Sequence, residues 1–239
     1  MKYFFICLVG ISCLTACRSE QEAQGSAPAM VKNVGAMKEV MWKGELFGKI
    51  RLDTIADKSG LYGIGPLTYL RGEILINDGR AFASRVLSDS SMLVEESYEI
   101  EAPFLVYANV KEWETSPLPA SVEDLQSLEA YLIEKTQAQK EPFVFKLIGS
   151  VASADIHIQN LAEGSSVSSP QEAHQGQQSY SVANTEVEII GFFSKHAQGI
   201  YTHHDTFMHM HLISKDGSKM GHLDRAKFEE MKLFLALND

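Results

Sequence analysis

The sequence predicts an α+β fold, with mixed or antiparallel β-sheets, few helices, and two similar sheet-containing halves packed together. Three observations lead to this prediction. Short runs rich in β-branched and aromatic residues recur along the 239-residue chain. Two Asp-Gly pairs, Asp78-Gly79 and Asp216-Gly217, mark tight hairpin turns. A clear leucine stripe at helical spacing occurs in residues 125–132.

The start of the chain is typical of an exported protein. A lysine and the apolar run at residues 3–9 precede Leu14-Thr15-Ala16-Cys17. Because this run is too short to span a bilayer and lacks a second charged flank, it indicates an export signal over residues 1–16. The last four residues look like a bacterial lipobox, which implies cleavage before Cys17 and a diacylglyceryl group on its sulfur. We therefore predict a membrane-anchored lipoprotein of the bacterial cell envelope, with its domain outside the cytoplasm.

The cysteines restrict the chemistry that the folded domain can perform. All three, Cys7, Cys13 and Cys17, fall in the opening segment. The rest of the chain therefore has no thiol for a disulfide, for thiolate catalysis or for a zinc–thiolate site. Any bound metal would need nitrogen and oxygen ligands. Residues 17–36, rich in small and polar side chains, are expected to form a flexible tether.

Composition indicates one soluble globular domain over residues 37–239, whose two halves would span about 37–139 and 140–239. The hydrophobic content of 45% suits an ordinary core. A formal net charge of −10 argues against a nucleic-acid partner, which would need a basic face. The 21 lysines and arginines are scattered, so an acidic polymer is also not expected as a ligand.

The first half is expected to contain strands at residues 68–76 and 104–110. Residues 38–50 mix apolar and charged side chains, which fits a helix or short turns that lead into the first sheet. The strand at 68–76 runs into Asp78-Gly79, a hairpin signal. Glu73 lies in this strand among apolar residues. By itself, such a glutamate is most often a solvated side chain on an exposed face.

A helix is predicted near the end of the first half. Pro119, Ser121 and Asp124 resemble the start of a capped helix that ends at about Ala138. Its leucines, Leu125, Leu128 and Leu132, are assigned to core packing. Strands are expected at 143–148, at 156–158 around His157, and at 187–193, with a polar loop at 164–179.

Residues 206–224 predict a β-hairpin with three histidines on one face. The strand that ends at Ser214 alternates, so His209 and His211 share a face. A two-residue type I′ turn at Asp216-Gly217 would place His211 opposite His222, and His209 opposite Asp224. Cβ atoms of cross-strand partners lie about 4.5 to 5.5 Å apart. The three imidazoles would thus converge to within reach of one first-row metal ion.

A lone histidine in a strand is more often a hydrogen-bonded, partly buried residue than a metal ligand. The register favours the metal here, because a slip of one residue would turn His222 to the other face. We therefore predict a metal site at His209, His211 and His222. Three further histidines are expected to be polar loop residues near the metal rather than ligands: His196, His203 and His204.

With this hairpin and Glu73, the chain resembles the α-acetolactate decarboxylases, bacterial lyases that convert 2-acetolactate to acetoin and CO₂. The resemblance implies that His209, His211 and His222 hold Zn²⁺, and that Glu73 lies in the same site as a ligand or proton relay. The similar motifs are Gly63-Ile64-Gly65 through Gly72-Glu73 with Asp78-Gly79, Pro103-Phe104, Gly191-Phe192 with Gly199-Ile200, and His209-Met210-His211 with Gly221-His222.

The chain departs from the family pattern in its substrate-handling groups. The family's catalytic arginine aligns with His157, and a threonine near the site aligns with Pro66. The segment between Gly199-Ile200 and His209 is longer than usual, and the family's C-terminal tail into the active site has no counterpart after Leu237. His157 would be a weaker donor to the substrate carboxylate than arginine, because imidazole lacks the guanidinium fork. Alternatively, His157 would be the acid that delivers the final proton.

The resemblance thus implies a carboxy-lyase of acetoin biosynthesis with Glu73 and His157 as catalytic residues. Zn²⁺ would be the cofactor and a 2-hydroxy-3-oxo acid the substrate, with no organic cofactor because the metal accepts the electrons. An alternative from another class is an envelope lipoprotein that keeps the metal fold for binding or for a different small-molecule reaction. The sequence leaves the oligomeric state open, and a homodimer is considered beside a monomer.

Overall fold

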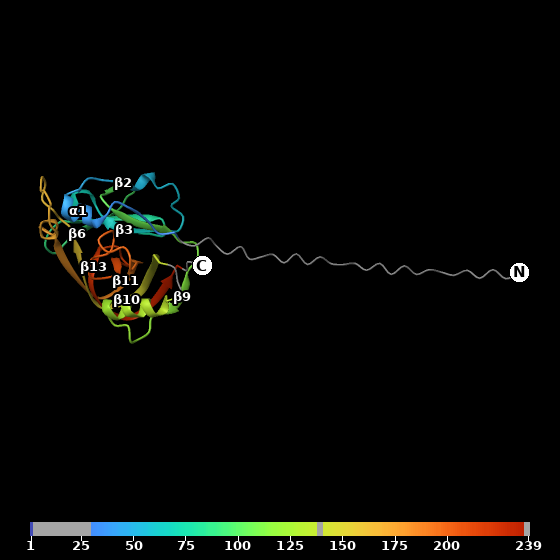
Figure 1. Cartoon of the computed structure of the whole chain (residues 1–239). Helices are drawn as coiled ribbons and strands as arrows, with labels where there is room; N and C mark the ends of the chain where they lie inside the picture. Colours follow the sequence, from blue (N-terminus) through green and yellow to red (C-terminus); the bar gives the residue numbers. More distant parts are fainter. Residues whose placement is uncertain (2–29, 138–140, 237–239) are drawn as a thin grey trace.

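The computed structural model describes residue 1 and residues 30–137 and 141–236. The predicted export signal, Cys17 and most of the predicted tether lie outside these residues. In the described chain, a first sheet (blue to green in Figure 1) packs over a second sheet that is mainly yellow to red. No helix in this part of the chain has the length and apolar character needed to cross a membrane.

The first sheet has six strands in the order β1-β8-β3-β4-β5-β6, and every neighbouring pair is antiparallel. A separate two-stranded ribbon lies beside it. The sheet consists of β1 (Lys32–Val34), β3 (Leu61–Pro66), β4 (Glu73–Asn77), β5 (Arg80–Val86), β6 (Met92–Glu96) and β8 (Leu105–Asn109), and the ribbon of β2 (Ile50–Arg51) and β7 (Glu101–Ala102).

The second sheet has the order β10-β11-β12-β13-β9, and β10 also pairs with β13. The pairings of β10, β11, β12 and β13 therefore form a closed ring. Because β12 lies between β11 and β13 in this ring, its residues are held from both sides. The strands are β9 (Glu114–Pro117), β10 (Phe143–Ile158), β11 (Gln178–Phe193), β12 (Met208–Ser214) and β13 (Met220–Leu235).

Three α-helices occur in the described chain: α1 (Met37–Lys43), α2 (Leu125–Lys135) and α3 (Pro170–Ala173). Helix α2 begins with the predicted cap, because the Asp124 carboxylate accepts from the Ser127 N–H at 2.8 Å and the Ser127 hydroxyl accepts from the Asp124 N–H at 3.0 Å. Leu128 and Leu132 are fully buried, which confirms their assignment to the core. The predicted end at Ala138 lies outside the described residues.

The two sheets share a hydrophobic core, so the predicted packing of the halves is confirmed. Tyr62 and Ile64 of β3 belong to the same buried cluster as Ile190 and Phe192 of β11 and Ile213 of β12. The predicted α+β class with mainly antiparallel sheets and few helices is also confirmed. The chain passes from the first sheet to the second between β8 and β9.

The strand predicted at residues 68–76 is wrong over its first part. Thr68–Leu70 is a 3₁₀ turn in which Tyr69 and Leu70 have φ values of 60° and 52°. Gly72 follows with φ 141°, and a Cβ there would lie 2.2 Å from the Ser84 carbonyl oxygen. Strand composition does not reveal such a left-handed turn. The strand therefore starts at Glu73, which is the first residue of an inner strand and pairs with Pro66 on one side and Ser84 on the other.

The two Asp-Gly pairs form different turns. At Asp78-Gly79 both φ values are positive, 48° and 76°, as in a type I′ turn, and Asn77 pairs with Arg80, so the hairpin predicted there is confirmed. At Asp216-Gly217 only the glycine has a positive φ, so the type I′ prediction is wrong there. The Asp216 carboxylate instead accepts hydrogen bonds from the Ser214 hydroxyl and the Ser218 N–H, which holds a longer connection.

Candidate metal centre

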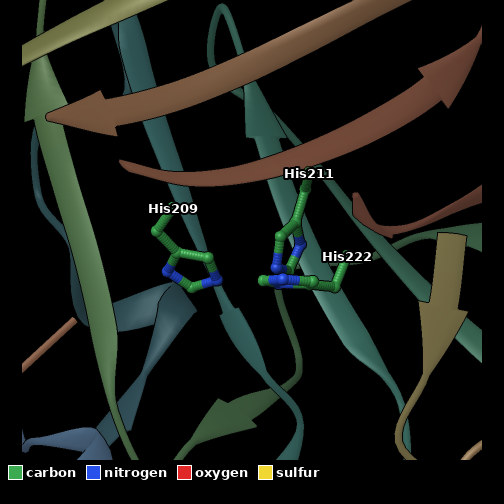
Figure 2. Close-up of side chains that lie close together, drawn as sticks. All are labelled: His209, His211 and His222. Carbon is green, nitrogen blue, oxygen red and sulfur yellow. The ribbon is translucent and has the colours of Figure 1, made fainter. Parts of the chain in front are cut away.

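Three histidines meet at the point where β12 and β13 pair. His211 lies directly opposite His222, as predicted. The ring centroids are 5.0 Å apart for His209 and His211, 5.0 Å for His209 and His222, and 5.4 Å for His211 and His222. Figure 2 shows the three rings directed toward a common point, and one ring nitrogen of each lies within 4.8 Å of the others.

Three of the six ring nitrogens in this trio are buried and have no hydrogen-bond partner among the described residues. His209 and His211 are buried and His222 is half-buried. In the described chain, Nδ1 of His209 and both ring nitrogens of His211 have no hydrogen-bond partner. Leaving a buried polar group unpaired costs about 1–3 kcal/mol, so several together point to a group that the protein alone does not supply.

Electrostatics also suit a metal ion. Burial lowers the pKa of His211 to about 3 and holds the pKa of His209 and of His222 well below the usual value. The rings are therefore neutral at pH 7, with lone pairs available for coordination. Neutral imidazole nitrogens are good ligands for first-row divalent ions. The residues present thus fit a divalent metal.

Glu73 reaches the same place from the first sheet. Its side chain is buried, so the solvated face that is usual for a glutamate does not apply here. One carboxylate oxygen accepts the Gln159 backbone N–H at 3.0 Å, and the other lies 3.8 Å from Nε2 of His211. Burial raises the pKa of Glu73 well above its usual value. A nearby divalent ion would oppose this shift and keep the carboxyl group ionised.

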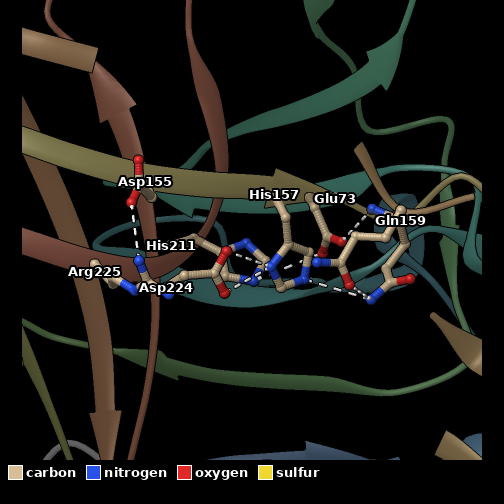
Figure 3. Close-up of polar contacts among 8 residues, drawn as sticks. Glu73, Asp155, His157, Gln159, His211, Asp224 and Arg225 are labelled. Atoms are coloured by element: carbon tan, nitrogen blue, oxygen red, sulfur yellow. Dashed lines mark hydrogen bonds and ion pairs between the residues drawn. The ribbon is translucent and has the colours of Figure 1, made fainter. Parts of the chain in front are cut away.

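His157 lies on the other side of His222. It is the cross-strand partner of His222 in β10 and β13, with ring centroids 4.6 Å apart. Its Nδ1 lies 2.8 and 2.9 Å from the two Asp224 carboxylate oxygens, and its Nε2 lies 3.4 Å from the Gln159 amide nitrogen. Figure 3 shows the resulting chain of contacts from Asp224 through His157 and Gln159 to Glu73.

The predicted pairing of His209 with Asp224 is wrong, and a β-bulge explains why. The pairing of β12 with β13 stops at His211 and His222. On the other edge of β13, Leu223 pairs with Ile156 but Arg225 pairs with Asp155, so Asp224 is an extra residue. A bulge re-aims the side chain of such a residue. Here it directs the Asp224 carboxylate to His157, a role that sequence reasoning missed.

One of the three loop histidines reaches the metal centre. His203 packs edge-on against His222 at 5.2 Å and against His209 at 6.3 Å between ring centroids. Its half-buried position differs from those of His196 and His204, which are exposed. Sequence reasoning treated the three alike. The unusual length of the segment before His209 was the one available signal that this loop has a role of its own.

A small inner cavity adjoins these groups. Its volume is about 30 Å³, which is the space of roughly one water molecule. Its polar side is lined by Glu73, Gln159 and five histidines, and no lysine or arginine is among the lining residues; the histidines are His157, His174, His203, His209 and His222. The apolar side is formed by Met37, Met41, Pro66, Leu70 and Phe104.

The chain belongs to the alpha-acetolactate decarboxylase family, whose model matches residues 34–238. Its structure is similar to those of acetolactate decarboxylase from Bacillus subtilis subspecies spizizenii (21% identity, TM-score 0.73, 87% of this chain and 85% of that chain) and alpha-acetolactate decarboxylase from Bacillus subtilis strain 168 (20%, 0.72, 87% and 85%). A Staphylococcus aureus protein of unknown function, described as similar to alpha-acetolactate decarboxylase, also matches (17%, 0.71, 86% and 84%). Comparison with curated proteins found no match. The family resemblance is therefore confirmed.

Proposed function

We propose that the protein decarboxylates 2-acetolactate to acetoin and CO₂ with a divalent ion, Zn²⁺, held by His209, His211 and His222. The observation that carries this proposal is the meeting of three neutral imidazoles beside the buried carboxylate of Glu73. Membership of the decarboxylase family supplies the reaction class. An all-nitrogen and carboxylate set suits Zn²⁺, which binds imidazole and carboxylate as well as thiolate.

The reaction needs an electron acceptor and one proton. The bond between the carboxylate carbon and C2 breaks, its electron pair moves toward the adjacent ketone, and a proton is then added to carbon. When bound, the ion supplies a Lewis acid that polarises the ketone and hydroxyl oxygens of the substrate. The protein side chains must therefore hold the substrate and move the proton.

Glu73 is suited to relay that proton or to complete the metal ligands. The Gln159 backbone N–H fixes one of its oxygens, which leaves the other directed toward His211. A fixed carboxylate next to the reacting atoms can exchange a proton without a large rearrangement. Its burial also excludes bulk water from the relay.

His157 and Gln159 are suited to contact the substrate carboxylate. Asp224 accepts the Nδ1–H of His157 and so sets the orientation of the ring, with Nε2 beside the Gln159 amide. Both side chains line the inner cavity. With no arginine in the lining, they hold the carboxylate less firmly than a guanidinium fork would. We therefore expect weak substrate binding.

The proposal includes a location at a bacterial membrane, which rests on the lipobox-like sequence alone. Acylation of Cys17 would anchor the chain in the cell envelope, with residues 17–36 as a tether and the domain outside the cytoplasm. A small 2-hydroxy-3-oxo acid would then be converted on that side of the membrane.

Incubation of the detergent-solubilised, zinc-loaded protein with racemic 2-acetolactate, followed by a colour test for acetoin, tests the function. We expect acetoin formation and about one zinc ion per chain by elemental analysis. The His209→Ala, His211→Ala double variant should lose both. Zinc bound in full with no acetoin formed would refute the decarboxylase proposal, and unchanged zinc in the double variant would refute the ligand assignment.

A further inference from the structure

A second cavity lies directly beside the metal centre, where β12 and β13 separate. These strands pair only between His211–His222 and Ile213–Met220. Beyond His211 and His222 the two strands diverge, and residues of helix α2 line the gap between them. The resulting outer cavity has a volume of about 400 Å³. It is thus more than ten times the size of the inner cavity.

Two histidines, His203 and His222, line both cavities. His222 is fixed by its strand and by its place in the histidine trio, whereas His203 belongs to the loop between β11 and β12. The inner cavity has room for roughly one water, whereas 2-acetolactate has nine non-hydrogen atoms, about nine times as many. A substrate bound to the metal must therefore occupy more than the inner cavity, and the outer cavity is the larger space on the far side of the His203 ring.

The loop is anchored on both sides of His203. On one side, Thr202 is fully buried and its carbonyl accepts the Gly199 N–H at 2.8 Å. On the other, the Glu129 carboxylate of α2 accepts the Thr206 hydroxyl at 2.5 Å and the Phe207 N–H at 2.7 Å. The segment 203–205 between these anchors is exposed or half-buried. His203 thus lies in the short segment between two anchored parts of the loop.

The walls of the outer cavity favour an alkyl group over a carboxylate. Met208, Met210 and Leu223 supply apolar surface. The charged side chains in the lining, Asp205, Glu129 and Asp224, are all acidic and would repel an anion. The carboxylate end of a bound acid should therefore point toward the metal, and its carbon chain toward the outer cavity.

We propose that the outer cavity is a subsite for the alkyl substituent at C2 of a 2-hydroxy acid, and that His203 determines which substituents bind. The inference rests on the proposed function for its substrate class. The His203 ring leaves space for a methyl group and excludes longer chains. Removal of this ring joins the two cavities, so that longer alkyl chains can bind.

The test compares two unreactive acids, 2-hydroxy-2-methylpropanoate and 2-hydroxy-2-methylpentanoate, which differ by two methylene groups. Their dissociation constants are measured by calorimetry on the zinc-loaded full chain. In His203→Ala the longer acid should gain about fourfold per buried methylene, or about 15-fold relative to the shorter one. The unsubstituted protein and His203→Phe, which keeps the ring, should show no such gain.

His204→Ala is the matched control, because His204 is the exposed neighbour of His203 and its recorded hydrogen bond uses only the backbone carbonyl. It should behave as the unsubstituted protein does. An unchanged ratio in His203→Ala, or no binding of either acid, would overturn the subsite. Loss of zinc from both His203 variants would overturn it too, because His203 would then be a metal ligand.

The experiment separates this inference from the proposed function, since it measures binding rather than decarboxylation. A gain for the longer acid in His203→Ala supports the subsite even where no acetoin is formed. As a second measure, extraction of zinc by 4-(2-pyridylazo)resorcinol should be faster in His203→Ala than in His203→Phe, because the joined cavities admit the chelator. Equal extraction rates in the two variants would contradict the proposal that the His203 ring separates the two cavities.

Discussion

The contact between His157 and Asp224 gives a prediction whose size can be worked out from the structure. Asp224→Asn keeps the shape of the side chain but removes its charge. A hydrogen bond to a charged group contributes about 1.5–3 kcal/mol to stability. The Asp224 side chain is 35% exposed, so solvent screening reduces this value to about 1 kcal/mol. We expect a loss of that size in the free energy of unfolding, measured by urea denaturation.

Activity should fall further than this stability loss suggests. An asparagine side chain can donate as well as accept, so it no longer selects the His157 tautomer with hydrogen on Nδ1. We expect acetoin formation to fall about tenfold in kcat, which corresponds to about 1.4 kcal/mol in the transition state. Asp155→Asn is the control, because Asp155 lies on β10, the strand of His157, but contacts Ser181 and Arg225 rather than His157.

A double-mutant cycle decides whether the two residues act together. The effects of His157→Gln and Asp224→Asn should not add, because both substitutions disturb the same contact between His157 and the Asp224 carboxylate. If the two losses in kcat add to within about 0.5 kcal/mol, His157 and Asp224 act independently and the reasoning fails. An equal effect of Asp155→Asn would show that any change of charge near β13 has the same consequence.

Three further predictions follow from other parts of the chain. Glu73→Gln should keep the zinc, bound more weakly, and lower acetoin formation by about 10² or more; near-normal activity would leave His157 as the residue that moves the proton. In the metal-free protein, burial lowers the pKa of His209, His211 and His222, so the unfolded chain binds more protons than the folded one below about pH 6.5. The free energy of unfolding should therefore fall as the pH drops from 6.5, by up to about 1.4 kcal/mol per pH unit for each histidine. The raised pKa of Glu73 has the opposite effect, which is smaller because it comes from one group rather than three. A free energy of unfolding that does not change with pH, measured by urea denaturation, would contradict this prediction. Cys17→Ala should release the protein from membranes, and a variant that stays with them after a high-salt wash would show that the lipobox interpretation is wrong.

The register of the histidine hairpin could be predicted from the sequence even though its turn was not. Pairing in an antiparallel hairpin keeps the sum of the two residue numbers constant. The predicted two-residue turn and the observed connection from Ser214 to Lys219 share the same sum, so His211 faces His222 in both. The alternation of the strand then places His209 on the same face. Two of the candidate ligands thus follow from local pattern, and the third from turn position.

The rest of the site depends on contacts between residues far apart in the chain. The residues that flank Glu73 in the sequence are those around any glutamate in a strand, so they do not mark it as buried. Only the packing of the first sheet on the second buries its side chain. The contact of Asp224 with His157 requires a bulge in the pairing of β10 with β13. The position of His203 requires a loop anchored by Glu129 of α2. No local sequence signal contains such information.

The left-handed turn before Glu73 shows the same limit in the fold. Strand propensity described residues 68–76 as one strand, but Tyr69 and Leu70 adopt positive φ values that β-forming side chains rarely take. Leu70 lines the inner cavity beside Glu73. Backbone strain of this kind persists where surrounding contacts enforce it, and here it coincides with the candidate site.

The charges in the site imply an order of binding. Without a metal, burial favours the protonated form of Glu73, and the lining of the inner cavity holds no lysine or arginine that could attract a carboxylate. An anionic substrate would therefore meet no fixed positive charge in the metal-free site. A divalent ion contributes +2, which balances the carboxylates of Glu73 and Asp224 once both are ionised, so we expect the ion to bind before the acid. Because no arginine lines the inner cavity, this dependence on the ion should be stronger here than in a site with a fixed guanidinium, which attracts the carboxylate whether or not metal is present.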